Sequence, residues 1–237
     1  METNKYKISR LTHTSTSNAF EKEDELVQLV RSGKVQQALL LWRPSDKTLV
    51  LPSGNKWQQS FDLITKLKER NWDLVSRRTG GAPVPQTNGV INLSHIYQWN
   101  NDTAYSIHVG YEHICEILTQ FFSYYDLTPE VHETPYSYCD GSYNLNINNQ
   151  KIVGTAQRVL LGQNQQKVIL VQACILIDAN MEELIYPVKL CNQFNNKDIC
   201  LKADVHTCLK ENIHTLPTTE QLYDHLLASF VRFYNNK

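Results

Sequence analysis

The chain has 237 residues, which is enough for one large hydrophobic core or one core with a small appendage, and its formal net charge at pH 7 is -1. It has no basic run and no interleaving of basic and aromatic residues, which argues against nucleic acid as a partner. No apolar stretch approaches the roughly 20 residues of a membrane span, and the start METNKYKISR lacks the apolar core of a signal peptide. We therefore expect a soluble, cytoplasmic protein that does not bind a membrane.

The six cysteines do not predict a disulfide framework, because the chain shows no export signal. No CxxC pair occurs in the sequence. Cys191, Cys200 and Cys208 stand near His206 and His214, but their spacings match no common zinc pattern. We predict neither a disulfide nor a metal site.

The first part of the chain predicts a helix followed by two strands. Asn18, with Glu21 three residues later, is typical of a helix start, and Gly33 is typical of a helix stop. Residues 37–42 and 48–51 have the composition of strands, and the Pro-Ser-Asp-Lys turn between them predicts a hairpin. The side chains of the helix that we expect to face the core are Phe20, Val27 and Val30.

Later segments alternate between helical and strand-like patterns. Helices are predicted at 61–70, where Phe61, Ile64 and Leu67 share a helical spacing, and at 109–122. Further strands are predicted at 74–77, 90–93, 103–107 and 167–177, and the last is apolar enough to be central. Thr218 with Gln221 caps a final helix that would bury Leu222, Leu226, Phe230 and Phe233.

Residues 135–158, PYSYCDGSYNLNINNQKIVGTAQR, contain the parts of a thiol active site. Two strand-like runs flank the pair Asn148-Asn149, which tolerates the left-handed backbone of a tight hairpin. Cys139 stands before the first run and Lys151 opens the second. The hairpin brings the two side chains together if the cysteine loop curls over the sheet.

A thiol next to an ammonium group can carry an acyl group. A neighbouring cation lowers the pKa of a thiol and so raises the fraction of nucleophilic thiolate. Cys139 could then accept an acyl group from a thioester or activated amide and pass it to an amine. Gly154, Thr155 and Ala156 follow Lys151 with small side chains, which leaves room for an apolar acyl chain. The alternative is that Cys139 is a small buried hydrophobic residue and Lys151 a solvated strand end.

Four histidines compete with Lys151 as the base partner of Cys139. His132 is the nearest to the cysteine in sequence. His113 lies within the predicted helix at 109–122, whose polar face explains it. The other two are His95 and His108.

A glycine loop precedes this region. Gly80-Gly81 can adopt backbone angles that turn main-chain N–H groups toward a ligand. Arg77 and Arg78 come directly before the loop, and because neighbouring residues of a strand face opposite ways, only one of them is expected to face a ligand. The alternative is an ordinary turn with two solvated arginines.

These motifs together resemble a known family. KIVGTAQR, which starts at Lys151, resembles the lysine motif of the biotin/lipoate protein ligases and transferases. RRTGGAPVP, from Arg77, and GVINLS, from Gly89, resemble the arginine and glycine signature that precedes this motif in the family. CDGSYNL, from Cys139, resembles the cysteine loop of the octanoyl and lipoyl amidotransferases, which act on the glycine cleavage H protein and on lipoyl domains.

The resemblance implies an α+β fold with a mixed, mostly antiparallel sheet flanked by helices, like the catalytic domain of biotin/lipoate ligases. It extends from about the first helix to about Asp178. We therefore expect residues 1–178 to form the catalytic domain and residues 179–237 a helical C-terminal extension packed on the same domain. The acyl tunnel is expected between the Gly80 loop and the Lys151 strand.

The resemblance further implies an acyltransferase that moves an octanoyl or lipoyl group through a Cys139 thioester to a lysine of a lipoyl domain, without metal, ATP or another cofactor. Lys151 would orient the acyl carbonyl and favour the thiolate. The implied partners are lipoyl-domain proteins, namely the H protein and dehydrogenase E2 subunits, or an acyl carrier protein. The implied substrate-binding residues are Arg77, Arg78, Gly80, Gly81, Gly154, Thr155 and Ala156.

Two alternatives to the transferase stay open. In an ATP-dependent lipoate ligase the lysine binds an acyl-adenylate and no cysteine is needed. Ala82 stands where ligases commonly have a third glycine, and Pro83, Pro85 and Gln86 stiffen a loop that in ligases usually carries a histidine, which weakens this alternative. The other alternative is a non-catalytic protein that binds acyl groups or lipoyl domains, and acylation of Cys139 distinguishes it.

Overall fold

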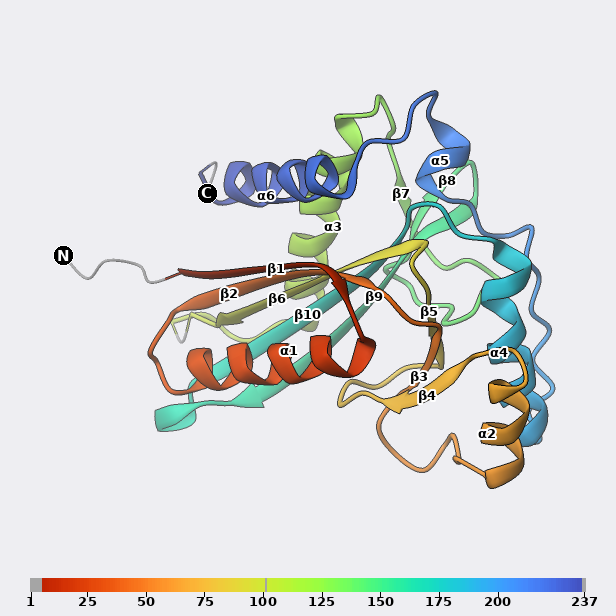
Figure 1. The fold of residues 1–237 in the computed structure, drawn as a ribbon. Helices are drawn as coiled ribbons and strands as arrows, with labels where there is room; N and C mark the ends of the chain where they lie inside the picture. Colours follow the sequence, from red (N-terminus) through yellow and green to blue (C-terminus); the bar gives the residue numbers. More distant parts are fainter. Residues whose placement is uncertain (1–5, 101, 236–237) are drawn as a thin grey trace.

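A seven-stranded sheet runs through the centre of the computed structural model, which describes residues 6–100 and 102–235 (Figure 1). The strand order is β1-β2-β6-β10-β9-β8-β7, and neighbouring strands are antiparallel except β1 and β2, which are parallel. This confirms the predicted α+β fold with a mixed, mostly antiparallel sheet. The strands are β1 (Tyr6–Thr14), β2 (Gln37–Pro44), β6 (Val90–Gln98), β7 (Glu130–Val131), β8 (Leu145–Ile147), β9 (Gln150–Leu161) and β10 (Lys167–Leu176).

β10 is the central strand, as its apolar composition predicted. It pairs with β6 on one side and with β9 on the other. Gln172 interrupts the buried apolar run of this strand. A polar side chain in the middle of a sheet needs a hydrogen-bonding partner, and the partners of Gln172 lie beside the site described below.

Helices cover both faces of the large sheet (Figure 1). α1 (Thr16–Arg31) packs on one face, and α3 (Ile107–Ser123) and α6 (Thr219–Asn235) pack together on the other. Each face of the sheet is therefore covered by its own hydrophobic cluster. The final helix is confirmed, because it buries the predicted side chains Leu222, Leu226, Phe230 and Phe233.

A smaller sheet, in the order β4-β3-β5, lies beside the large one and packs against α2 and α4 (Figure 1). A third hydrophobic cluster fills the space between these elements. The strands of this sheet are β3 (Thr48–Leu51), β4 (Asp73–Ser76) and β5 (Val84–Gln86). The helices beside it are α2 (Phe61–Lys68) and α4 (Met181–Phe194), and the remaining short helices are α5 (Leu209–Asn212) and the 3-10 turn η1 (Gln163–Gln165).

The predicted hairpin between residues 37–42 and 48–51 is wrong. Both segments are strands, but β2 lies between β1 and β6 in the large sheet, whereas β3 lies between β4 and β5 in the small one. Because both edges of β2 are already hydrogen-bonded, the chain crosses to the second sheet after Pro44. The Pro-Ser-Asp-Lys segment does form a turn, but its composition does not specify which strands pair.

The first helix begins earlier than predicted. Its N-cap is Ser15, whose side chain accepts the backbone N–H of Asn18 at 3.2 Å. Asn18 thus belongs to the first turn and does not begin the helix. The predicted stop is confirmed, since Gly33 follows the helix with a φ of 70°, a left-handed backbone that glycine adopts freely.

The second helix faces the core through only one of the three predicted residues, Leu67. Leu63 and Leu67 are fully buried, whereas Phe61 is 81% exposed and Ile64 is 36% exposed. A helix of only two turns meets its neighbours β4 and α4 along one narrow face. The face that packs runs from Leu63 to Leu67 and leaves out Phe61 and Ile64.

The strand predicted at residues 103–107 is also wrong. This segment turns into α3, and Trp99 Nε1 donates to the main-chain oxygen of Thr103 at 3.1 Å. Tyr105 packs edge-on against Trp99, with ring centroids 5.2 Å apart. The preceding strand β6 has no free edge for this segment, because it is already paired with β2 and β10.

Within the described residues, no helix is long and apolar enough to cross a membrane. In the same part of the chain, no group of three or more His, Cys, Asp or Glu side chains is placed to hold a metal ion. All six cysteines have free thiols. The division of the chain at Asp178 stays a prediction.

Candidate active site

The tight hairpin at Asn148-Asn149 is confirmed. The φ angles of Asn148 and Asn149 are 50° and 63°, and Ile147 pairs with Gln150 across the turn. Two consecutive left-handed residues give a turn whose twist matches that of the flanking strands. The turn therefore starts β9 directly beside β8, with Lys151 as its second residue.

A β-bulge aims Lys151 into the interior. Leu145 pairs with Val153 and Asn146 pairs with Lys151, so β9 has one extra residue between these pairs. The bulge brings Lys151 and Gly154 to the same face of the sheet. A β-carbon on Gly154 would lie 3.2 Å from Cε and 3.3 Å from Nζ of Lys151, so the absence of a side chain at Gly154 makes room for the lysine.

Lys151 is fully buried. Its Nζ donates to the main-chain oxygens of Tyr138 at 2.5 Å and Cys139 at 2.9 Å, and it lies 4.5 Å from the centre of the Tyr138 ring. Burial lowers the pKa of Lys151, and the neighbouring thiols and Asp140 oppose this effect. No carboxylate of the described residues forms an ion pair with Lys151, so the site has positive charge to offer a ligand.

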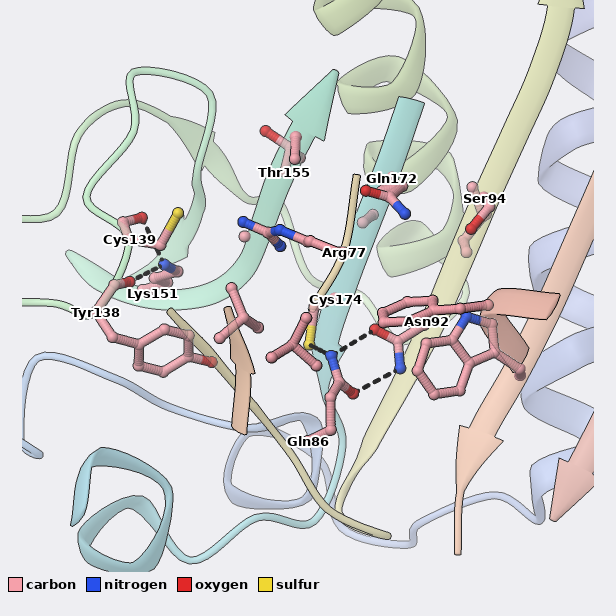
Figure 2. Close-up of a pocket in the computed structure, with 18 residues that line it drawn as sticks. Arg77, Gln86, Asn92, Ser94, Tyr138, Cys139, Lys151, Thr155, Gln172 and Cys174 are labelled. Carbon is pink, nitrogen blue, oxygen red and sulfur yellow. Dashed lines mark hydrogen bonds between the residues drawn. The ribbon is translucent and has the colours of Figure 1, made fainter. Parts of the chain in front are cut away.

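Cys139 sits at the tip of a loop that curls over the sheet, as the prediction required (Figure 2). Its φ is 52°, a left-handed backbone that is uncommon for a residue with a side chain. Hydrogen bonds fix this conformation: Asn144 Nδ2 donates to the Cys139 oxygen at 3.3 Å, and Asp140 accepts the N–H of Thr134 at 2.6 Å. The structure thus brings Cys139 and Lys151 together through the backbone of the loop.

Several groups act on the Cys139 thiol. Burial raises its pKa, but the positive charges of Lys151 and Arg77 and hydrogen bonds from the Ala82 N–H and the Arg77 side chain outweigh burial and lower the pKa overall. By contrast, burial raises the pKa of the Cys174 thiol to about 11. The environment therefore favours a thiolate at Cys139 and a neutral thiol at Cys174.

The glycine loop reaches the thiol through Arg77 and Gly81. Arg77 Nη2 donates to the oxygens of Gly80 at 2.8 Å and Ala82 at 3.2 Å. A β-carbon on Gly81, whose φ is 108°, would lie 3.1 Å from Arg77 Nη2 and 3.5 Å from Cys139 Sγ. Gly81 thus permits the close approach of the arginine to the cysteine loop.

The other two predicted residues of the glycine loop, Arg78 and Gly80, do not contact Cys139. Arg78 is exposed and pairs with Asp24 at 3.1 Å. A β-carbon on Gly80 would meet no atom within 4 Å. Of the two arginines, only Arg77 approaches Cys139, although both lie just beyond the end of β4 at Ser76.

A cavity extends from Cys139 and Lys151 between the two sheets (Figure 2). Its floor consists of residues of β9, β10 and β6, and the predicted residues Gly154, Thr155 and Ala156 lie in that floor. Thr155 Oγ1 donates to the Tyr143 oxygen at 2.8 Å, which ties the floor to the cysteine loop. On the opposite side the small sheet contributes apolar side chains such as Val84.

His132 does not belong to this site. Its Nδ1 is bonded to the Glu133 oxygen at 2.7 Å, and its Nε2 lies 3.6 Å from a Glu130 carboxylate. His95 is buried, and burial lowers its pKa to about 3. His108 bonds to the hydroxyl of Tyr143 at 2.5 Å. None of these histidines is among the residues that line the cavity.

The sequence analysis did not predict that residues 205–207 pack beside Lys151 and hold its main chain. His206 is 3% exposed, and its ring stacks on Tyr138 with centroids 4.9 Å apart. The main chain of Lys151 is bonded to Val205 and Thr207 at 2.9 Å each. Burial, together with the charge of Lys151, lowers the pKa of His206 to about 4, so this histidine is neutral at physiological pH. The sequence contains no local signal for this support.

A buried polar network beside the cavity was also missed. Gln172 donates to both carboxylate oxygens of Glu23, at 2.7 and 3.0 Å, and accepts from Thr79 Oγ1 at 2.9 Å. Ser94 donates to the same carboxylate at 2.5 Å. The network joins α1 to the glycine loop across the sheet. Gln172, a polar residue inside an apolar central strand, was the available signal.

The chain belongs to the family of the lipoyl protein ligase A/B catalytic domain, whose model matches residues 15–231. It is 33% identical over 142 residues to the octanoyl-[GcvH]:protein N-octanoyltransferase of Macrococcus caseolyticus, which covers 60% of this chain and 47% of that protein. It is 31% identical over 163 residues to the lipoyl-[GcvH]:protein N-lipoyltransferase of Listeria monocytogenes, which covers 68% of this chain and 56% of that protein. The chain thus spans about half the length of these curated relatives.

Solved structures support the same fold. A lipoate-protein ligase A bound with ATP superposes with a TM-score of 0.73 at 14% identity, over 98% of this chain and 86% of that one. A putative lipoate protein ligase from Thermoplasma acidophilum with bound lipoic acid gives 0.72 at 14% identity, over 98% and 87% of the two chains. The family resemblance inferred from the sequence motifs is confirmed.

Proposed function

We propose that this protein is an acyltransferase that moves an octanoyl or lipoyl group through a thioester on Cys139 to a lysine of a lipoyl domain. The observation that carries the proposal is the thiol of Cys139, whose pKa is lowered by Lys151 and Arg77, in the lining of a cavity between two sheets. The relatives named as octanoyl- and lipoyl-[GcvH]:protein transferases support the same chemistry.

The reaction takes place in two balanced steps. In the first, Sγ of Cys139 attacks the acyl carbonyl of the donor, an S–C bond forms, and the bond from the carbonyl to the donor's sulfur or nitrogen breaks. The leaving group takes up a proton. In the second, a neutral lysine amine of the acceptor attacks the thioester carbonyl and loses one proton to solvent, which balances the proton taken up in the first step. An amide forms, the S–C bond breaks, and the Cys139 thiolate leaves. No nucleotide is consumed in either step.

Each residue of the site has a role in this scheme. Lys151 holds the cysteine loop and favours the thiolate, and Arg77 adds a second positive charge beside the sulfur. Gly81 and Gly154 leave the space that these two cations occupy. Thr155 and Ala156 contribute to the floor on which the acyl chain would lie. The proposed donor is the acyl-lysine of an H protein or the thioester of an acyl carrier protein, and the proposed acceptors are lipoyl domains of H proteins and E2 subunits.

An acyl-transfer assay tests the proposal. The full chain is incubated with an octanoylated H protein and a purified lipoyl domain without ATP, and the mass of the domain is followed. We expect octanoylation of the domain by the wild type and by Cys200→Ser, a control at an exposed thiol, but not by Cys139→Ser. Full activity of Cys139→Ser would refute the thioester route. Transfer that requires ATP and free octanoate would indicate a ligase instead.

A further inference from the structure

Three buried side chains contact one another beside the cysteine loop. The centre of the Tyr138 ring lies 4.5 Å from Nζ of Lys151. The same ring is parallel to that of His206 to within 14°, with centroids 4.9 Å apart. Tyr138 and His206 are each 3% exposed, and Lys151 is fully buried. The tyrosine ring therefore connects the histidine to the lysine.

The ammonium group of Lys151 is held by this ring as well as by the main chain. Two of its three N–H groups are bonded to the oxygens of Tyr138 and Cys139, which Figure 2 shows pointing at Nζ. Gly154 has no side chain to limit the movement of Nζ, since a β-carbon there would lie 3.3 Å away. An ammonium group close to a ring centre is attracted to the face of the ring, most strongly away from water. The Tyr138 ring therefore keeps the ammonium group beside the two oxygens.

His206 in turn holds the tyrosine ring. Its main-chain N–H donates to the Ala203 oxygen at 3.0 Å, and its Nδ1 is bonded to the same oxygen at 3.3 Å. These two bonds fix the imidazole in a tight turn. Burial and the charge of Lys151 lower the pKa of His206 to about 4, so the ring that stacks on Tyr138 is neutral. A neutral ring does not repel the ammonium group that lies against the same tyrosine.

The segment that carries His206 joins the two halves of the active site. The N–H of Lys202 donates at 3.1 Å to the oxygen of Tyr136, which comes shortly before the reactive cysteine. The main chain of Lys151 exchanges two hydrogen bonds of 2.9 Å with the residues on either side of His206. This segment comes after Asp178, in the region that the sequence motifs assigned to the C-terminal extension. The extension therefore contributes contacts to both the loop and the strand of the site.

We propose that Tyr138 and His206 are positioning residues, which fix the ammonium group of Lys151 against the cysteine loop and so keep the Cys139 thiol in its reactive form. The inference rests on the proposed function and assigns part of it to the C-terminal segment. His206 acts through Tyr138, and Tyr138 acts through Lys151, so neither role needs contact with the acyl group. A displacement of about 1 Å in a reacting group can lower a rate about 100-fold, so a ring one contact away from the lysine can control the reaction.

Alkylation of the Cys139 thiol in the full chain tests the inference without an acyl donor. The pH midpoint of its reaction with iodoacetamide is followed by peptide mass mapping. His206→Leu removes the stacked ring and should raise the midpoint by at least about half a pH unit, whereas His206→Phe keeps a ring and should restore the wild-type midpoint. His95→Leu is the matched control, because His95 is also buried and stacked, on Tyr97 with centroids 4.5 Å apart, but does not line the cavity. It should leave the midpoint unchanged.

Two further comparisons separate positioning from a general loosening of the fold. Adding His206→Leu to Lys151→Met should leave the midpoint where Lys151→Met alone places it, because the histidine acts through the lysine. Tyr138→Leu removes the middle ring and should raise the midpoint, whereas Tyr138→Phe keeps the ring and should not. The tyrosine pair keeps the test available where His206→Leu does not fold, which thermal melting reports.

Acyl transfer from an octanoylated H protein gives the second readout. The rate should fall about tenfold or more in His206→Leu and recover in His206→Phe. An unchanged midpoint in the folded His206→Leu or Tyr138→Leu variant, an equal shift in His95→Leu, or an unchanged transfer rate in His206→Leu would overturn the inference. Since alkylation needs no acyl group, midpoints that shift as expected in a wild type that transfers no acyl group would contradict the proposed function alone.

Discussion

The ammonium group of Lys151 donates to the main-chain oxygen of Cys139 at 2.9 Å, so the buried lysine holds the cysteine loop by its backbone. The same nitrogen donates to the Tyr138 oxygen at 2.5 Å. Both carbonyl oxygens accept hydrogen bonds from the ammonium group, but neither neutralises its charge. The positive charge therefore still acts on the thiol of Cys139.

Lys151→Met should raise the pKa of the Cys139 thiol. An opposite charge at close range shifts a pKa by about 1–3 units, so the midpoint of thiol alkylation by iodoacetamide should move up by at least about one pH unit. Lys202→Met, at an exposed lysine over the Tyr136 ring, is the matched control and should leave the midpoint unchanged. An unchanged midpoint in Lys151→Met would show that the lysine does not activate the thiol.

Gly154→Ala should displace the lysine and leave the fold intact. The new β-carbon would lie 3.2 Å from Lys151 Cε, the flexible part of a side chain, so the ammonium moves rather than the strand. We expect the rate of acyl transfer to fall about tenfold or more, in line with about 1.4 kcal/mol or more of lost stabilisation. Gly141→Ala is the control, because its β-carbon meets only Asn144 Oδ1 at 3.9 Å. Equal rates for the two variants would contradict the proposed role of Gly154.

Arg77→Ala and Arg78→Ala should differ sharply. Arg77 makes charge-assisted hydrogen bonds within the glycine loop and to the thiol, and the loss of such a bond costs about 1.5–3 kcal/mol, or roughly 10- to 100-fold in rate. Arg78 forms an exposed pair with Asp24, and such pairs contribute about 0–1 kcal/mol. Steady-state transfer rates of the two variants measure the difference. A larger loss in Arg78→Ala would reverse the assignment.

His206 should make folding sensitive to acid. Burial lowers its pKa from 6.5 to about 4, so between these values the unfolded chain binds the proton that the folded chain excludes. The stability from this group is complete above about pH 6.5 and is lost as the pH falls toward 4. From pH 7 to pH 4.5, urea unfolding should show a loss about 2 kcal/mol smaller in His206→Phe than in the wild type. An equal loss in both proteins would mean that His206 titrates normally.

Much of the site could be predicted because its signals are local. The Asn148-Asn149 turn and the strands beside it fix the hairpin, and a short loop leaves Cys139 few places other than over Lys151. The prediction that only one of Arg77 and Arg78 faces the site was also correct, although the strand on which it was based ends at Ser76. These features depend on residues that are close together in the sequence.

The parts that could not be predicted depend on pairing between distant segments. The turn after β2 gives no indication that β3 joins a different sheet. The contact of His206 with Tyr138 and the bond from Gln172 to Glu23 join residues 68 and 149 positions apart. Cys174 lies between Gly154 and Asn92 only through the register of three strands, which side-chain patterns in one strand do not reveal.

The central claim is that Cys139 carries the acyl group. The most direct test is the intact mass of the full chain after incubation with an octanoylated H protein, or with an octanoyl-acyl carrier protein, without ATP. The account predicts a gain of one octanoyl group that maps to Cys139, persists in Cys200→Ser and is absent in Cys139→Ser. The account would be contradicted if neither donor gave an adduct, or if an adduct remained in Cys139→Ser.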